Sequence, residues 1–145
     1  MLILNEEAEM ARLSARMKEI FEKRNNIVLA TASKAGTPNV VVVAAKKILD
    51  DETILISDQY FSKTLANMKE NPQVALTFWD KAEGYQLKGH ATIETSGRLY
   101  EDTTAWIEAL GKKIDMPLES KGAVVIKIEE IYTITPGPHA GARIA

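Results

Sequence analysis

Residues 54–78 read ILISDQYFSKTLANMKENPQVALTF, and the rest of the chain is organised around this stretch. Its pattern predicts a buried strand, a short loop, one short helix and a second buried strand. Ser62 is a good N-cap residue for the helix, because its hydroxyl can accept a backbone N–H that the first turn leaves free. Asn71 and Pro72 end the helix, since proline cannot continue it.

The first turn of this expected helix carries an unusual charge. Helices commonly place Asp or Glu there, because an acidic side chain complements the positive end of the helix dipole. Here Lys63 and Thr64 follow Ser62 instead. Free N–H groups, two hydroxyls and an ammonium group at one point are the components of a phosphate site. The alternative is an exposed lysine on a weak helix, and the local sequence leaves both interpretations open.

The composition limits the classes of protein to consider. The 145 residues are 46% hydrophobic and 26% charged, which is sufficient for one domain with a full core. A net charge of −2 argues against nucleic acid as a partner, and the absence of cysteine excludes disulfides and cysteine metal sites. The two histidines, His90 and His139, lack a metal-binding spacing, and no apolar run reaches the length of a membrane span. We therefore expect a cytoplasmic protein with no metal, nucleic-acid or membrane partner.

An amphipathic helix is predicted over residues 5–24. Asn5 can cap it, and its first turn is acidic, with Glu6, Glu7 and Glu9. Its apolar positions fall on one face, as in a helix that covers a core; they are Met10, Leu13, Met17 and Ile20.

The remaining pattern is typical of a mainly β protein with flanking helices. Strands are predicted over residues 27–33, 39–49, 53–57, 73–80, 85–95 and 123–134, and a further helix over 98–113. The first three strands follow each other through short turns, which implies antiparallel pairing. Gly89 lies inside a strand and indicates a bulge or the close approach of another group. We expect a single domain over residues 1–145, a small barrel of six strands capped by helices, with an irregular tail over 135–145.

Four segments, taken in order, resemble the FMN-binding split-barrel family, which includes pyridoxamine 5'-phosphate oxidase and small flavoproteins. The resemblance covers residues 27–134. The segments are IVLATASKAGTPNV from Ile27, the strand ending in Ala45, Lys46 and Lys47, the S-K-T-x-x-N-x-x-x-N-P segment from Ser62, and QLKGHATI from Gln86.

The resemblance implies a six-stranded antiparallel split β-barrel that forms a homodimer and binds two FMN molecules in grooves between the subunits. The segment that binds the FMN phosphate is matched by Ser62, Lys63 and Thr64. The strand along the isoalloxazine ring is matched by Val42, Val43, Ala44, Ala45 and Lys46, of which Lys46 matches a basic position that contacts phosphate or flavin in relatives. A valine-rich strand suits this role, because a flavin ring needs apolar walls and backbone groups for its polar edge.

The function implied is that of an FMN-binding flavoprotein, an oxidoreductase or an electron carrier that exchanges electrons with a small molecule. No catalytic side chain is assigned, since the cofactor itself carries the redox chemistry. Two alternatives stay open. Some split-barrel relatives ligate haem through a tail histidine, a position that His139 matches, and a non-catalytic module could bind flavin or deazaflavin. We also expect the tail to fold over the FMN site of its own or the partner subunit.

Overall fold

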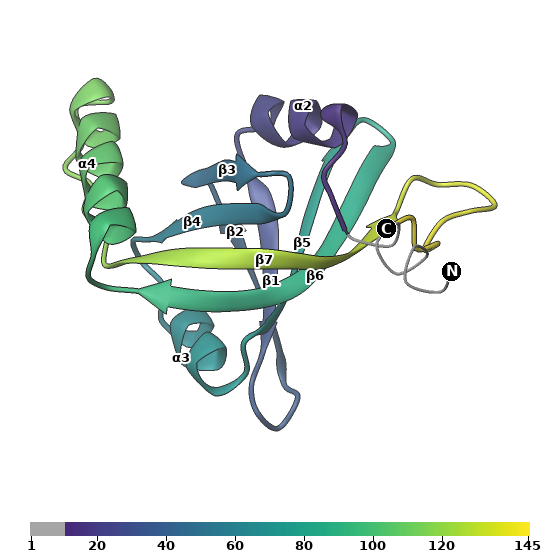
Figure 1. Ribbon diagram of the computed structural model, residues 1–145, viewed down its shortest axis with the longest axis horizontal. Coiled ribbons are helices and arrows are strands. Elements are labelled where there is room, and N and C mark those ends of the chain that lie inside the picture. Colours follow the sequence, from purple (N-terminus) through teal and green to yellow (C-terminus); the bar gives the residue numbers. More distant parts are fainter. Residues whose placement is uncertain (1–10) are drawn as a thin grey trace, which may run out of the picture.

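The computed structural model describes residues 11–145, which form one curled, fully antiparallel sheet with three helices (Figure 1). The order of strands across the sheet is β2-β1-β5-β6-β7-β4-β3, so β2 and β3 are its two edges. The strands are β1 (Ile27–Ala32), β2 (Pro38–Val43), β3 (Lys46–Asp50), β4 (Thr53–Asp58), β5 (Gln73–Asp80), β6 (Glu83–Glu94) and β7 (Gly122–Thr133).

The sheet has seven strands where the sequence predicted six. The difference lies at residues 39–49, which were expected as one strand but form β2 and β3 with Ala44 and Ala45 between them. The two strands are separated by only these two residues, yet they lie at opposite edges of the sheet. The sheet must therefore curl until its edges approach each other, which makes it an open half-barrel.

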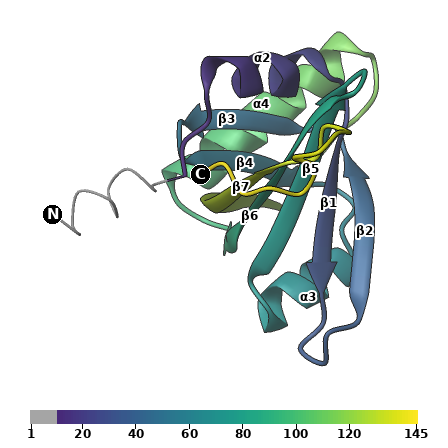
Figure 2. The same ribbon diagram turned by 90° about the vertical axis from the view of Figure 1, so that its right-hand side faces the viewer.

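Two of the three helices match the predicted ranges. The helix α3 (Lys63–Glu70) begins after Ser62 and ends at the C-cap Asn71, and α4 (Arg98–Lys113) covers the whole predicted range. Packing places α2 (Ala15–Lys23) on β5, α3 on β1 and β2, and α4 on β7. Figures 1 and 2 show α2 and α3 at opposite ends of the curled sheet.

The N-terminal helix begins later than predicted. Residues 11–14 are not helical, and the Ser14 hydroxyl accepts the Met17 N–H at 3.2 Å and caps the first turn of α2. The Leu13 N–H donates to the Asp51 carbonyl at 2.7 Å, so this segment is held by the β3–β4 turn instead. The predicted cap Asn5 and the acidic first turn lie outside the described residues.

The core fills the inside of the curl. The Phe21 ring of α2 meets the Phe78 ring of β5 edge to face, with centroids 5.4 Å apart. Around this pair lie fully buried aliphatic side chains from several strands, among them Ile27, Leu29, Ile54, Ile56, Leu76, Leu87, Ile126 and Ile131.

The structure shows a register shift beside Gly89, with the extra residue Glu129 on β7, and a close approach of the β7 backbone to Gly89. The β6–β7 register shifts between Lys88 and Gly89, and a Cβ at Gly89 would lie 2.1 Å from the Lys127 carbonyl oxygen. Only glycine tolerates this approach of the β7 backbone. Within residues 11–145, no helix is both long and apolar enough to cross a membrane.

Candidate functional site

A cavity of about 480 Å³ lies along the edge strand β2 and the break that follows it. One wall is residues 41–45, a second is the end of β4 with its following loop, and the third is the C-terminal part of α4 and the segment after it. The lining residues are Val41, Val42, Val43, Ala44, Ala45, Ser57, Gln59, Tyr60, Phe61, Leu110, Ile114 and Leu118. The lining is mainly apolar, and its volume falls within the range of about 300–1,000 Å³ typical of small-molecule sites.

Four of the predicted flavin-binding residues, Val42, Val43, Ala44 and Ala45, line this cavity. The break between β2 and β3 places them there. The Ser57 N–H of β4 donates to the Ala45 carbonyl at 3.0 Å, and this bond joins the first wall to the second. Because β2 has only β1 as a neighbour, its other side presents backbone N–H and C=O groups that the sheet does not use.

The loop over residues 59–62 connects the cavity to the start of α3. Asp58, whose exposed fraction is 2%, accepts the Phe61 N–H at 2.9 Å through Oδ1. The Lys121 ammonium donates to the Phe61 carbonyl at 3.1 Å. Both backbone groups of Phe61 are thus held by side chains, so the loop has a defined path from the cavity wall to Ser62.

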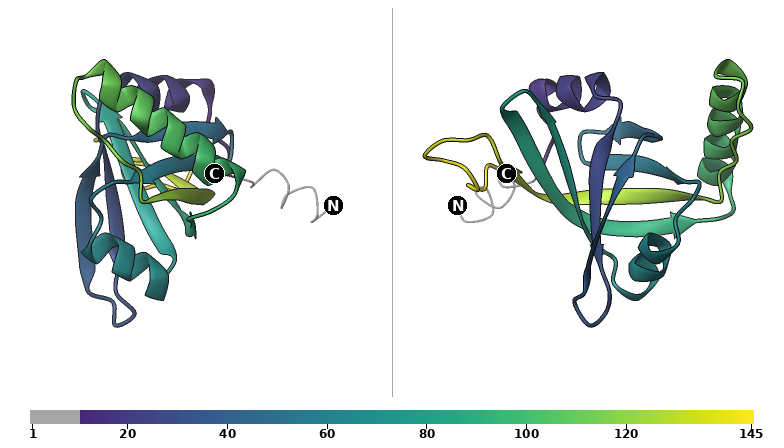
Figure 3. Two further views of the ribbon diagram at one scale, coloured as in Figure 1. Left: turned by 90° about the vertical axis from the view of Figure 1, so that its left-hand side faces the viewer. Right: turned by 180° about the vertical axis from the view of Figure 1, so that it is seen from behind.

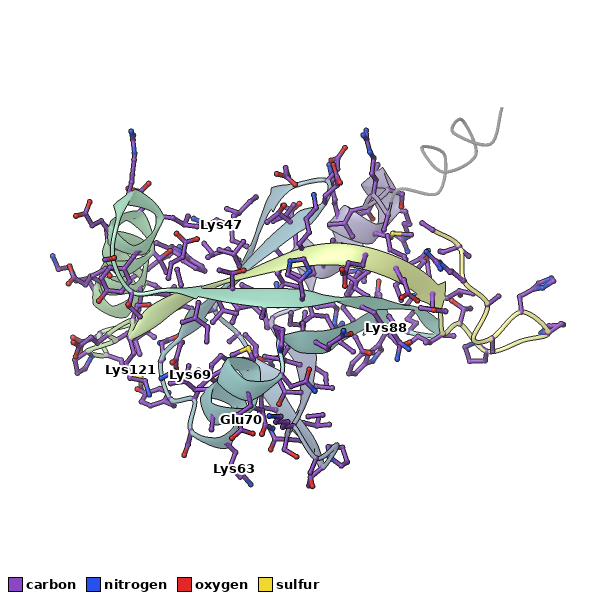
Figure 4. All side chains as sticks on the ribbon, turned by 60° about the horizontal axis from the view of Figure 1, so that its bottom comes forward. Lys47, Lys63, Lys69, Glu70, Lys88 and Lys121 are labelled. Atoms are coloured by element: carbon purple, nitrogen blue, oxygen red, sulfur yellow. The ribbon has the colours of Figure 1, made fainter. Side chains whose placement is uncertain are left out.

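The N-terminus of α3 has the predicted character of an anion site. Ser62 occupies the N-cap position, but its hydroxyl accepts no N–H of the first turn, contrary to the expected cap bond. The first turn contains no acidic residue. Lys63 is exposed, and Figure 4 shows its side chain pointing away from the body of the protein. The first-turn N–H groups and the ammonium are therefore available to an anion.

Thr64 has a different position from the other two residues of the predicted phosphate segment. Its side chain is 2% exposed, and its hydroxyl accepts the Asn39 amide at 3.0 Å. Thr31 also accepts from Asn39, at 3.3 Å, and from Asn67, at 3.1 Å. These four side chains join α3 to β1 and β2. Thr64 thus orients the helix, while Ser62 and Lys63 remain at its exposed end.

Lys46 does not line the cavity. Its ammonium donates to the Phe21 carbonyl at 2.7 Å and lies 4.7 Å from the centroid of the Phe21 ring. Burial against α2 lowers the pKa of Lys46, and the nearby Glu22 partly opposes this shift. The residue predicted to contact the flavin therefore packs against α2.

The sequence did not predict the third wall of the cavity. Leu110, Ile114 and Leu118 come from α4 and the segment that follows it, more than 60 positions after the β2 residues they face. The sequence indicated an apolar face on the predicted helix 98–113, but periodicity does not show what such a face covers. On the same helix, the Trp106 ring lies 4.4 Å from the Lys47 ammonium, which reaches from β3 toward α4 (Figure 4).

Neither histidine lines the cavity. The Nδ1 atom of His90 lies 3.2 Å from the Glu129 carboxylate across the β6–β7 pair. His139 is exposed in the tail. Residues 11–145 contain no group of three His, Asp or Glu side chains placed to hold a metal ion.

The sequence predicted that the tail folds over the site of its own or the partner subunit. In the structure, the tail does not cover the cavity of its own chain. It turns back along β7, where the Ile131 N–H donates to the Ala145 carbonyl at 2.9 Å and the Ile144 N–H donates to the Ile131 carbonyl at 2.8 Å. Figures 1 and 3 show the tail and α4 at opposite ends of the molecule.

Comparison with known proteins gives three informative matches. The uncharacterized protein MJ0282 of Methanocaldococcus jannaschii is 44% identical over 140 residues, covering 94% of this chain and 90% of the relative. The structure of HupZ from Group A Streptococcus has a TM-score of 0.76 at 25% identity, covering 89% of this chain and 99% of HupZ. The structure of an FMN-binding protein from Syntrophomonas wolfei has a TM-score of 0.69 at 20% identity, covering 93% of this chain and 91% of that protein.

The family assignment rests on most of the chain. The family model for pyridoxamine 5'-phosphate oxidase matches residues 13–135, from the segment before α2 to the end of β7. Proteins of this fold include FMN-binding proteins, reductases of the deazaflavin F420 and haem-binding proteins. The sequence match, the curled antiparallel sheet and the 44% identical relative agree, and the chain belongs to the pyridoxamine 5'-phosphate oxidase-like FMN-binding split-barrel family.

Proposed function

We propose that this protein binds FMN in the cavity along β2 and acts as an oxidoreductase or electron carrier for a small molecule. The observation that carries the proposal is the continuity of the site. An apolar cavity of about 480 Å³ is followed, through the four-residue loop 59–62, by a helix N-terminus with an exposed lysine and no acidic residue. FMN has a matching arrangement, with its ring system at one end and its phosphate at the other.

The ring end of the site fits an isoalloxazine system. Val41 and Val43 supply aliphatic contact, and Ala44 and Ala45 leave room for a flat ring close to the backbone. The unpaired edge of β2 offers N–H and C=O groups to the polar edge of the ring. Bound FMN would supply the redox chemistry, while these groups would hold the ring and exclude water from one of its faces.

A homodimer is part of the proposal. Val40 and Val42 are 62% and 67% exposed on the outer side of β2, and Trp79 of β5 is 43% exposed. Large apolar side chains gathered on one surface are characteristic of an interface. A second copy on this surface would cover the open side of the cavity, where Val42 contributes to the lining.

The test is reconstitution of the purified protein after bound small molecules have been removed. Incubation with FMN is expected to quench the flavin fluorescence and to give a yellow protein with about one FMN per chain after gel filtration. Light scattering is expected to report twice the chain mass of 16.0 kDa. A protein that retains no flavin would refute the proposal, and a 16.0 kDa particle with bound FMN would refute its dimeric form.

A deazaflavin is the second candidate, because the same apolar walls and helix N-terminus suit its ring and phosphate. Its support is the structural similarity to an F420 reductase, with a TM-score of 0.60 at 21% identity. Parallel titrations with FMN, the deazaflavin and haem separate the candidates by their absorbance spectra. Haem has less support, since His90 and His139 both lie away from the cavity lining.

A further inference from the structure

The loop that joins the two ends of the site is held by a pair of side chains from different strands. Asp58 ends β4, and Lys121 directly precedes β7. The Lys121 N–H donates to the Asp58 carbonyl at 2.7 Å, beside the last β4–β7 pair, Asp58 and Gly122. The Asp58 carboxylate then accepts the Phe61 N–H, and the Lys121 ammonium donates to the Phe61 carbonyl.

The burial of the two side chains is unequal. The Asp58 side chain is 3% exposed, whereas that of Lys121 is 49% exposed, and the Lys121 ammonium lies 3.7 Å from the Asp58 carboxylate. Burying a carboxylate is unfavourable unless it accepts hydrogen bonds or faces a positive charge. Here both compensations come from groups that also determine the path of the loop, so the burial of the Asp58 carboxylate and the position of Phe61 depend on each other.

The structure behind the loop is also held by hydrogen bonds. The Ser57 hydroxyl donates to the Ser120 hydroxyl at 2.8 Å, and the Ser120 hydroxyl donates to the Gly122 carbonyl at 3.1 Å. Ser57 and Ser120 are both 3% exposed. Side-chain hydrogen bonds thus hold the base of the loop, and the solvent-accessible Lys121 connects this base to the loop.

We propose that Asp58 and Lys121 are positioning residues that fix the ring end and the phosphate end of the flavin site at one separation. This inference rests on the proposed FMN binding. Gln59, Tyr60 and Phe61 line the cavity, and Ser62 begins the helix that faces the phosphate. Lys121 is not a lining residue and acts on the ligand only through Phe61. Its loss frees Phe61 and the neighbouring N-cap residue Ser62 to move, while Thr64 still holds α3 to β2 through Asn39.

The proposal distinguishes FMN from riboflavin, which has the ring but no phosphate. A shift of Ser62 and of the backbone beside it weakens the phosphate contacts, because hydrogen bonds depend steeply on distance and angle. It leaves the ring contacts with residues 41–45 in place. A purely structural role for Lys121 would instead lower the affinity for both ligands by the same factor, since it would act on the fraction of folded protein.

The test uses fluorescence titrations of the full chain with FMN and riboflavin. Lys121→Met keeps the aliphatic stem and removes the ammonium, and it is expected to lower the ratio of FMN to riboflavin affinity by about tenfold. Asp58→Asn is expected to change the ratio in the same direction. Lys121→Arg, which can still donate to the Phe61 carbonyl, is expected to preserve the wild-type ratio.

Lys127→Met is the matched control, because Lys127 is a β7 lysine with a similarly exposed side chain that pairs with Glu52 instead of the loop. Amide hydrogen exchange of apo protein gives a second measurement, in which Lys121→Met is expected to accelerate exchange over residues 59–64 more than Lys127→Met does. Wild-type protein that binds neither flavin would overturn the proposed function and this inference with it. Wild-type protein that prefers FMN, together with an unchanged ratio in Lys121→Met or equal losses for both ligands, would overturn the inference alone.

Discussion

The exposed lysine at the start of α3 leads to a prediction in which ligand affinity and protein stability change in opposite directions. Lys63 is the first residue of the helix, where the backbone dipole is already positive and no acidic side chain lies in the first turn. Replacing Lys63 by Ala should remove the proposed charge-assisted contact to the FMN phosphate, and such a contact is worth about 1.5–3 kcal/mol. FMN affinity should fall by roughly tenfold to a hundredfold.

The same substitution should not destabilise the apo protein. Removing a positive charge from a helix N-terminus relieves an unfavourable interaction of about 0.3–1 kcal/mol. Lys69 provides the matched control, since it is exposed in the last turn of the same helix, where a positive charge is favourable (Figure 4). Lys69→Ala should therefore lower the free energy of unfolding by about 0.3–1 kcal/mol and leave FMN affinity unchanged.

Two measurements on each variant check this prediction. Urea unfolding of the apo protein gives the stability, and quenching of flavin fluorescence gives the affinity for FMN and for riboflavin. Riboflavin should bind wild type and Lys63→Ala equally, because it has no phosphate. If Lys63→Ala bound FMN as tightly as wild type does, the helix N-terminus would not be the phosphate site and the reasoning would fail.

Three further predictions concern other parts of the chain. Lys46→Met should lower the free energy of unfolding by about 1 kcal/mol without changing FMN affinity, because the ammonium contacts Phe21. Burial lowers the pKa of Lys46 in the folded protein, so between this lowered pKa and 10.5 the unfolded chain binds more protons than the folded one. The free energy of unfolding of wild type should therefore rise slightly with pH in this range, and that of Lys46→Met should not. Gly89→Ala should destabilise by at least about 2 kcal/mol in urea unfolding, because its Cβ meets a β7 carbonyl; Gly122→Ala, where the nearest atom is 3.6 Å away, should have a much smaller effect. Val42→Asp should weaken both the proposed dimer and FMN binding, and light scattering at several concentrations that shows an unchanged mass would contradict the interface.

The sequence alone was sufficient to locate most elements and to identify the family. The helix after Ser62, its end at Asn71, the helix over residues 98–113 and a register shift beside Gly89 are all present. The helices follow from local patterns, such as helical periodicity and a proline that cannot donate an N–H, and Gly89 was recognisable because glycine has no Cβ. Local patterns of this kind can be read along the chain without knowing what packs on them.

Where the chain changes direction was harder to predict, because the reason lies in distant partners. Residues 39–49 have the pattern of one long strand, and nothing local marks the break at Ala44 and Ala45. The break exists because residues 38–43 pair with β1 while residues 46–50 pair with β4, at the other edge of the sheet. Strand propensity is similar on both sides, so only the competition between these two partners decides where the chain leaves β2.

The shape of the site was decided by the tertiary structure. Residues 42–45 line an apolar cavity and residues 62–63 lie at an exposed helix N-terminus, but the sequence did not reveal the wall from α4 or the loop held by Lys121. Its assignment of Lys46 to the flavin stays a prediction, and in the structure that side chain packs on Phe21. Residue type and spacing along the chain determine which groups are available. Which of them face a common space depends on how the sheet curls, and that is set by strand pairings between segments far apart in the sequence.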